Sequence, residues 1–137
     1  MKASELTSKD LMIGDWLQDS FGNIGQVYRL DPGRVHLRLL QERPQDEEYI
    51  VHDIEPIPLT PELLENNGFG LRENATSCWT LETDSKCTII ITACEKITIY
   101  KPCLYGYRRV VDEIEMRYLH ELQHLLKMCH IKFDWKV

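Results

Sequence analysis

Short apolar segments alternate with turn residues over the first 55 positions of the chain. Aliphatic, β-branched and aromatic residues dominate each segment, and Gly22-Asn23 and Asp31-Pro32-Gly33 supply turn residues between them. Short apolar runs that are bounded by turn residues are typical of strands. The strands expected in this part of the chain cover residues 12–17, 24–30, 35–39 and 49–51.

The second part of the chain begins after a proline-rich connector and carries patterns for both helices and strands. Thr60 and Pro61 predict a helix start and Gly68 predicts its stop, so a helix is expected over 61–67. A β-branched meander follows, and then apolar residues at helical spacing predict a long helix that Asp112 caps. The last residues alternate apolar with charged, which indicates a strand with one buried face. The expected strands cover 78–83, 87–93 and 96–101, the long helix 112–129, and the final strand 131–137.

These patterns predict an α+β fold with two lobes. Residues 1–55 are similar to an SH3-like small β-barrel in their order of strands and turns, and residues 56–137 form an α+β lobe. That lobe would contain a helix, an antiparallel β-meander, a long C-terminal helix and a short final strand. The same pattern is also compatible with one packed unit. SH3-like barrels bind RNA, peptides or other domains without catalysis, so the likeness favours a binding module but does not select its ligand.

The strongest chemical motif is H-E-x-x-H at His120–His124, followed by His130. Histidines four residues apart lie on one face of a helix and can share a zinc ion, and Glu121 would then activate a metal-bound water. The spacing from His120 to His130 equals that of the metzincins, whose pattern this segment resembles. One interpretation is therefore a zinc-dependent hydrolase with ligands His120, His124 and His130 and with Glu121 as the base.

Two features of the sequence favour a solvated helix surface over a metal site. Lys127, a good helix former, stands where the metzincins have the glycine that turns the chain back toward the metal. In a helix over 112–129, His120 and His124 fall roughly opposite the apolar stripe, and His130 points elsewhere. We therefore expect no metal cofactor and no catalytic residue, with zinc as the alternative.

Charge and cysteine content restrict the class of protein further. The 137 residues carry a formal net charge of −6, which disfavours non-specific coating of nucleic acid. The five cysteines form no C-x-x-C pair, and the N-terminus lacks the apolar stretch of a signal peptide. Reduced thiols in the cytoplasm are expected. No apolar run approaches the length of a membrane span, so no membrane association is expected.

Trp16, Phe21 and Tyr28, three aromatic residues of the N-terminal lobe, are the candidate binding residues. An acidic chain lacks a general attraction for phosphates, so its affinity for a partner must come from shaped local contacts. The expected partner is a protein or a defined nucleic-acid structure. Alternatively, Trp16 and Tyr28 fill the core of the lobe. The oligomeric state is left open by the sequence.

Three segments carry a recognisable pattern: Asp10–Trp16, then Ile54–Leu64 with Asn67-Gly68-Phe69, then Arg117–Gln123. They resemble the pattern L-x-I-G-N-W-V, I-x-P-I-P-L-T, G-F and Y-V-H-x-L-Q of a family of uncharacterised small proteins from anaerobic gut bacteria, often linked to prophages and mobile elements. The resemblance implies a phage- or mobile-element-associated protein without an established activity. In that pattern the final helix often reads H-Q-L-Q-N, without the glutamate and the second histidine of a zinc site.

Two hypotheses of function follow. The first is a non-enzymatic binding or accessory protein, associated with a phage or a mobile element. The second is the zinc-dependent hydrolase that uses the H-E-x-x-H segment. The metal content of the protein distinguishes them.

Overall fold

The computed structural model describes residues 6, 8–40, 45–73 and 77–137. These residues form two five-stranded antiparallel sheets and two α-helices, so the structure is mixed but rich in strand. The described chain divides into two compact units. Unit 1 contains the residues up to Pro58, the segment Tyr118–His124 and Val137, and unit 2 contains Leu59–Arg117 and Leu125–Lys136. The lobes expected from the sequence are residues 1–55 and 56–137.

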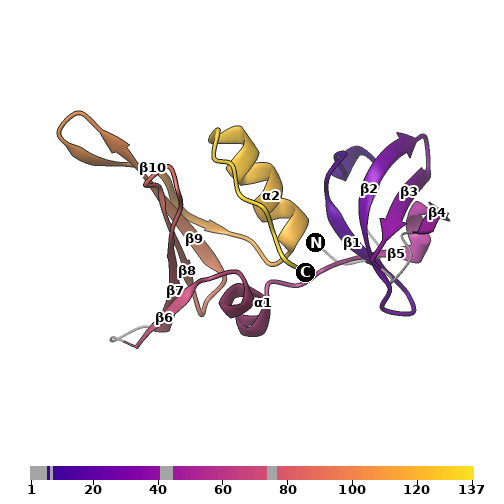
Figure 1. Cartoon of the computed structure of the whole chain (residues 1–137), viewed down its shortest axis with the longest axis horizontal. Helices are drawn as coiled ribbons and strands as arrows, with labels where there is room; N and C mark the ends of the chain where they lie inside the picture. Colours follow the sequence, from indigo (N-terminus) through magenta and orange to yellow (C-terminus); the bar gives the residue numbers. More distant parts are fainter. Residues whose placement is uncertain (1–5, 7, 41–44, 74–76) are drawn as a thin grey trace. The chain divides into compact units, whose positions relative to one another are not determined.

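The first sheet belongs to unit 1 and consists of a four-stranded meander and one returning strand (Figure 1). Its strands are β1 (Trp16–Asp19), β2 (Ile24–Asp31), β3 (Arg34–Leu39), β4 (Gln45–Ile50) and β5 (Ile54–Pro56). They are ordered β4-β3-β2-β1-β5. Since β4 and β5 are the two edges, the described strands do not close into the barrel that we expected. The strand expected over 49–51 is the end of the longer β4, and a short 3₁₀ helix (Val51–Asp53) follows it.

The start of β1 also differs from the expectation, because the strand begins at Trp16 and not at Met12. A turn replaces the first part of the expected strand. In this turn the Asp15 N–H donates to the carbonyl of Met12 (3.1 Å), and the Met12 N–H donates to the Asp15 carboxylate (2.8 Å). Gly14 has a φ of 97°, a conformation that glycine adopts at little cost. The local turn chemistry therefore outweighs the strand pattern of these residues.

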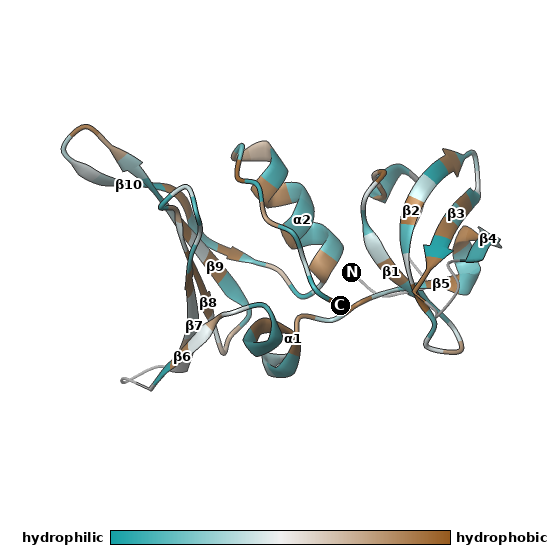
Figure 2. Cartoon of the chain, viewed as in Figure 1, coloured by the Kyte–Doolittle hydropathy of each residue, from teal (hydrophilic) through white to brown (hydrophobic). Residues whose placement is uncertain are grey.

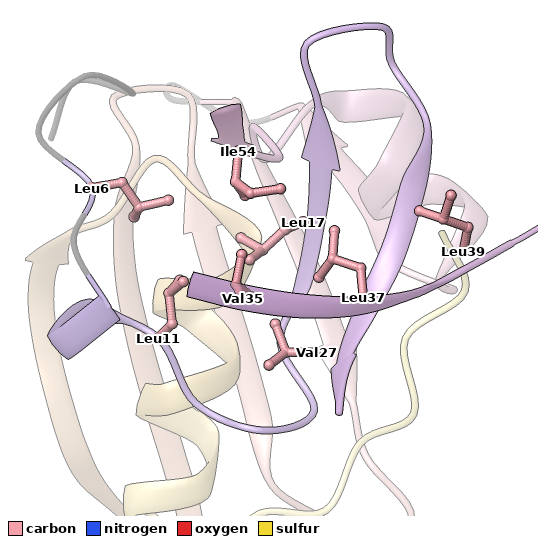
Figure 3. Packing of buried hydrophobic residues seen from close by; sticks show 8 residues of the cluster. All are labelled: Leu6, Leu11, Leu17, Val27, Val35, Leu37, Leu39 and Ile54. Carbon is pink, nitrogen blue, oxygen red and sulfur yellow. The ribbon is translucent and has the colours of Figure 1, made fainter. Parts of the chain in front are cut away.

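Alternating side chains of the first sheet build the hydrophobic core of unit 1. The inward positions of β1 and β3 are buried, as expected for strands that cover a core on one side. At Gly25 an added Cβ would lie 3.0 Å from side-chain atoms of Leu37 and Leu39, so a larger residue there would require these neighbours to shift. Figure 3 shows the core side chains pointing toward one another: Leu6, Leu11, Leu17, Val27, Val35, Leu37, Leu39 and Ile54.

The second sheet belongs to unit 2 and is the antiparallel meander that the sequence predicts, extended by one strand at each edge (Figure 1). The three central strands confirm the expected ones, and both added strands are the outer members of hairpins. Its strands, in spatial order, are β6 (Gly70–Glu73), β7 (Ser77–Glu82), β8 (Thr88–Thr92), β9 (Lys96–Cys103) and β10 (Gly106–Glu115).

Helix α1 (Pro61–Asn66) confirms the sequence prediction, including its cap. The hydroxyl of Thr60 accepts a hydrogen bond from the Leu63 N–H (3.2 Å), and Pro61 occupies the first turn, where its missing N–H has no intrahelical partner to lose. After the helix, the side chain of Asn67 exchanges two hydrogen bonds with the backbone of Lys136 (2.6 and 2.8 Å). These bonds attach the C-terminal segment to the end of α1.

The long helix expected over 112–129 is wrong in its first part. Residues 106–115 form β10, and helix α2 extends only over Leu119–Met128, so Asp112 caps no helix. The β-branched residues of this stretch pair with β9, and two register shifts bend the strand, with Glu113 at a φ of 50°. Tertiary pairing therefore overrides the helical spacing of the apolar residues.

The final strand expected over 131–137 is not formed, although the expected alternation of burial is present. Ile131 and Trp135 are buried, and the charged residues between them are exposed. The rings of Trp135 and Phe69 stack at 6.1 Å, and Phe133 packs edge-on against Trp135 at 4.8 Å. This segment is therefore held by side-chain packing within unit 2, and not by the ladder of backbone hydrogen bonds that was expected.

Candidate functional site

The first turns of α2 belong to unit 1 and contact the turn that precedes β1. The start of the helix is placed by a hydrogen bond from the Leu119 N–H to the carbonyl of Ile57 (2.8 Å) and by a bridge between Pro58 and Tyr118. The proline-rich connector therefore sets the position at which the H-E-x-x-H segment begins. We define the His–Asp cluster as Asp15, His120, Gln123 and His124.

Gln123 binds the turn through both ends of its side-chain amide. Its Oε1 accepts a hydrogen bond from the Trp16 N–H (2.9 Å), and its Nε2 donates to the carbonyl of Gly14 (3.0 Å). A glutamine offers a donor and an acceptor on one planar group, which fits a backbone N–H and a carbonyl of neighbouring residues. The glutamine of the motif therefore has a structural role in unit 1.

His124 pairs with Asp15, a carboxylate with only 2% of its surface exposed. The His124 Nε2 lies 2.8 and 2.7 Å from the two carboxylate oxygens. The Met12 N–H also donates to this carboxylate, so both oxygens of the buried acid have partners. A buried carboxylate without such partners would be strongly disfavoured, so His124 is needed to keep Asp15 in place.

His120 is buried, with 1% of its surface exposed, and lies between two aromatic neighbours. Its ring stacks on Tyr118 at 6.2 Å and meets the ring of His124 at 5.7 Å. Among the described residues, its Nδ1 has no hydrogen-bond partner. Burial lowers the pKa of His120; His124 acts in the same direction, and the carboxylates of Asp15, Glu121 and Asp10 act against it. The imidazole is therefore kept neutral inside unit 1.

This arrangement corrects the expectation of a solvated face with incidental histidines. His120 is part of the core, and His124 is about three-quarters covered and bonded to Asp15. The prediction of a solvated helix face was wrong because it compared helix residues only with one another. The group that covers this face is a turn more than a hundred positions earlier in the chain.

The three histidines of the motif are not brought together within one unit. His120 and His124 belong to unit 1, and His130 follows α2 in unit 2 with a φ of 56°. Glu121 is half-buried and lies between the two histidines of unit 1 in sequence. Among the described residues, no group of three or more His, Cys, Asp or Glu side chains lies close enough together to hold a metal ion.

The candidate binding residues Trp16 and Tyr28 share the outer face of the first sheet. The register aligns Trp16 with Gln26 and Gln26 with Arg38, so these side chains form a row across β1, β2 and β3. The Arg38 guanidinium lies 5.3 Å from the centre of the Tyr28 ring. Trp16 and Tyr28 are half-buried, and neither belongs to the hydrophobic core of unit 1.

Phe21, the third candidate, is 89% exposed in the turn between β1 and β2. Asp19 holds this turn: its buried carboxylate accepts hydrogen bonds from the N–H groups of Phe21 and Asn23 (both 2.9 Å) and from the Tyr49 hydroxyl (3.0 Å). Burial alone would raise the pKa of Asp19, but the hydrogen bonds from Asn23, Tyr49 and Phe21 outweigh it and lower that pKa. Burial and the bond to Asp19 raise the pKa of Tyr49 to about 12. An exposed aromatic residue is thus presented on a well-bonded turn.

Cations on the outer face of the first sheet are paired with carboxylates. The pairs are Arg29–Asp31 (3.2 Å), Arg34–Glu48 (3.3 Å) and Arg38–Asp46 (3.0 Å), and the His36 Nε2 also lies 3.0 Å from the Asp31 carboxylate. The arginine pairs are partly to largely exposed and contribute little to stability, whereas the His36 side chain is only 13% exposed. The carboxylates neutralise the arginine side chains, so this face carries no strong positive field.

Asp15, Gln123 and Asp19 are the site residues that sequence reasoning missed. Gly14-Asp15 before an aromatic strand start was an available signal for a turn with a side-chain acceptor. Nothing in the sequence indicated that Gln123 would bind this turn.

No family model, no curated protein and no solved structure matches this chain. Within the described residues, no helix has both the length and the apolar character that a bilayer crossing requires.

Proposed function

We propose that the chain is a non-enzymatic binding or accessory protein, associated with a prophage or another mobile element. The observation that carries this proposal is the use of the H-E-x-x-H segment in packing: His120 is buried, His124 is bonded to Asp15, and Gln123 is bonded to the same turn. Side chains that hold a turn in this way are not free to bind and release a substrate. The mobile-element association rests on the sequence resemblance alone.

The order of strands in unit 1 supports an SH3-like lobe. Four strands form a meander, a 3₁₀ turn follows the fourth, and the fifth returns to pair with the first. SH3-like lobes share this order and act as binding modules. In this proposal the outer face with Trp16 and Tyr28, together with Phe21, receives the partner.

A protein or a defined nucleic-acid structure fits this face better than unstructured nucleic acid. The paired charges leave no net positive field, so affinity must come from aromatic contact and from the shape of the surface. We place the protein in the cytoplasm, because all five cysteines are free thiols.

The alternative is the zinc-dependent hydrolase, and one observation favours it. The buried Nδ1 of His120 has no partner among the described residues, and an unpartnered imidazole nitrogen is a potential metal ligand. In that case His120, His124 and His130 would supply ligands and Glu121 would act as base. The two histidines would then need to leave their present contacts with Asp15 and Tyr118.

The metal content of protein purified without a histidine tag tests the proposal. We expect no stoichiometric zinc, measured by plasma mass spectrometry after dialysis, because His124 is already occupied by Asp15. The matched variants are His120→Ala and His52→Ala, of which only the first alters the motif. About one equivalent of zinc per chain that persists in His52→Ala and is lost in His120→Ala would overturn the proposal in favour of the hydrolase.

A further inference from the structure

The hairpin of β9 and β10 extends beyond the rest of the second sheet. β8 pairs with β9 only from Ile97 to Tyr100, whereas β9 and β10 stay paired out to Cys103 and Gly106. Figure 1 shows this end of the hairpin projecting past β8. We call residues 101–109 the hairpin arm. A two-stranded ribbon of this kind is only marginally stable in water without further packing.

The tip of the hairpin arm exposes large apolar side chains. Leu104 is 88% exposed and Tyr105 is 94% exposed, and Tyr107 beside them is 60% exposed. Figure 2 shows hydrophobic colouring at this turn. Single exposed apolar residues are ordinary on a protein surface, but three of them on one projecting turn form a patch that indicates an interaction site.

The hairpin arm is also basic, in a chain with a formal net charge of −6. Between Lys96 and Val111 the sequence contains four cations and no carboxylate. Lys101 donates to the carbonyl of Cys129 (2.7 Å), and Arg109 pairs with Asp112 (3.2 Å). Arg108 is exposed and has no ion-pair partner among the described residues.

The register places Arg108 directly opposite Lys101 on the neighbouring strand. Like charges at facing positions of a sheet destabilise it unless an anion lies nearby. Asp112 pairs with Arg109, which leaves Arg108 and Lys101 facing each other without a carboxylate bonded to either among the described residues.

Unit 2 carries a groove whose charge is opposite to that of the hairpin arm. It lies between the β7–β8 turn and the segment after α2, with a volume of about 750 Å³. Three carboxylates line it, those of Glu82, Asp84 and Asp134, and Phe133 adds an aromatic surface; Lys132 and His130 also line it. The volume is sufficient for a leucine and a tyrosine side chain, and the carboxylates are suited to a guanidinium.

We propose that the hairpin arm of one copy of this chain enters the acidic groove of a second copy. Leu104 and Tyr105 fill the groove, and Arg108 faces its carboxylates. In an antiparallel meander the β7–β8 and β9–β10 turns lie at the same end of the sheet. The hairpin arm therefore projects from the end of unit 2 at which the groove lies. Two copies that meet at this end exchange arms reciprocally, and the contact closes as a two-fold dimer.

Charge complementarity selects a second copy as the partner. The chain itself supplies both a basic apolar tip, on which Arg108 has no ion-pair partner among the described residues, and a groove with an aromatic wall in which carboxylates outnumber cations. Nucleic acid would satisfy the cations but would leave the acidic groove unexplained and would be repelled by the remainder of an acidic protein.

Sedimentation velocity of the full chain over a range of concentrations tests this proposal. We expect reversible dimerisation that weakens with salt between about 0.05 and 0.5 M, because ion pairs contribute to it. Arg108→Glu and Tyr105→Ser should each weaken the association constant by at least about tenfold. Both positions are exposed, so the far-UV circular dichroism and the urea midpoint of the monomer should stay unchanged.

A charge exchange supplies the decisive control. Asp84→Lys with Asp134→Lys should weaken association as Arg108→Glu does, and the combination of all three substitutions should restore it. Arg72→Glu, on the exposed edge strand at the other side of the same sheet, is the matched variant and should leave association unchanged.

A protein that stays monomeric under all conditions would overturn the proposal, as would association that is indifferent to Arg108→Glu. Binding of monomeric protein to nucleic acid that is lost in Arg108→Glu would assign the hairpin arm to that other partner.

Discussion

Two buried polar residues, Asp15 and His120, constrain the packing of unit 1. Asp15 and His120 are nearly inaccessible to solvent, yet only one of them has its polar groups fully bonded. A carboxylate must be paired when it is buried, whereas an imidazole can be buried in its neutral form at a smaller cost. Asp15 is therefore surrounded by donors, and His120 is stabilised by ring contacts and by remaining uncharged.

The lowered pKa of His120 makes the stability of the protein depend on pH. Because the folded state disfavours protonation, the unfolded state binds more protons below the ordinary histidine pKa of about 6.5. Stability is therefore full above this pH and falls as the pH is lowered through it. We expect His120→Leu to reduce this loss, measured as the change in urea midpoint between about pH 7.5 and 5.5.

The control for this prediction is His52→Gln, which removes an exposed histidine and leaves the His124–Asp15 pair in place. It should retain the pH dependence of the wild type. Equal slopes for the wild type, His120→Leu and His52→Gln would contradict a role for His120 in the pH dependence of stability.

At the scale of elements, local signals predicted α1 and the central strands of the second sheet, and tertiary contacts decided the rest. Thr60, Pro61 and Gly68 act on the backbone next to them, so their effect is visible in sequence. β10 was interpreted as helix because Val111 and Ile114 fit a helical stripe, but pairing with β9 makes them strand residues. The exposed face of α2 was assigned wrongly for the same reason, since the turn at Asp15 that covers it is distant in sequence.

Substitutions on α2 test the corrected face. His124→Asp should destabilise the protein by about 2–4 kcal/mol, because it places a second carboxylate against the buried Asp15 and removes the partner of that acid. Leu122→Asp should cost a similar amount, because Leu122 is fully buried. From the sequence alone, the expected cost of His124→Asp was under about 1 kcal/mol, as for a solvated position.

The matched control is Lys127→Asp on the exposed surface of the same helix. It should cost under about 1 kcal/mol, through its unfavourable charge near the C-terminal end of the helix. Urea unfolding at neutral pH measures all three substitutions. A His124→Asp variant as stable as Lys127→Asp would show that the bond between His124 and Asp15 contributes nothing to folding.

At the scale of the whole molecule, charge is the property that the sequence predicted most directly. The formal net charge of −6 follows from counting, and the structure adds where the cations lie. Arginines on the first sheet are paired with carboxylates, and on the second sheet Lys96, Lys101, Arg108 and Arg109 lie on the β9–β10 hairpin while Arg72 lies on β6. The candidate binding face could be guessed from its aromatic residues, whereas the acidic groove could not, because residues 81–85 and 130–134 form it together. The hairpin arm is one continuous segment, but its end was not recognised because part of it was interpreted as helix.

This distribution of charge predicts how the protein responds to nucleic acid in general. We expect no tight binding to mixed-sequence DNA or RNA at about 0.15 M salt, since non-specific affinity requires many phosphate contacts from unpaired Lys and Arg side chains. Fluorescence anisotropy with a labelled oligonucleotide measures this, and a version of the chain with Glu48→Gln and Asp46→Asn is the informative comparison. Those substitutions free Arg34 and Arg38 on the first sheet, so they should raise non-specific affinity and steepen its dependence on salt. Tight, sequence-indifferent binding by the wild type with an equally steep salt dependence would mean that the ion pairs of the first sheet do not suppress its positive field.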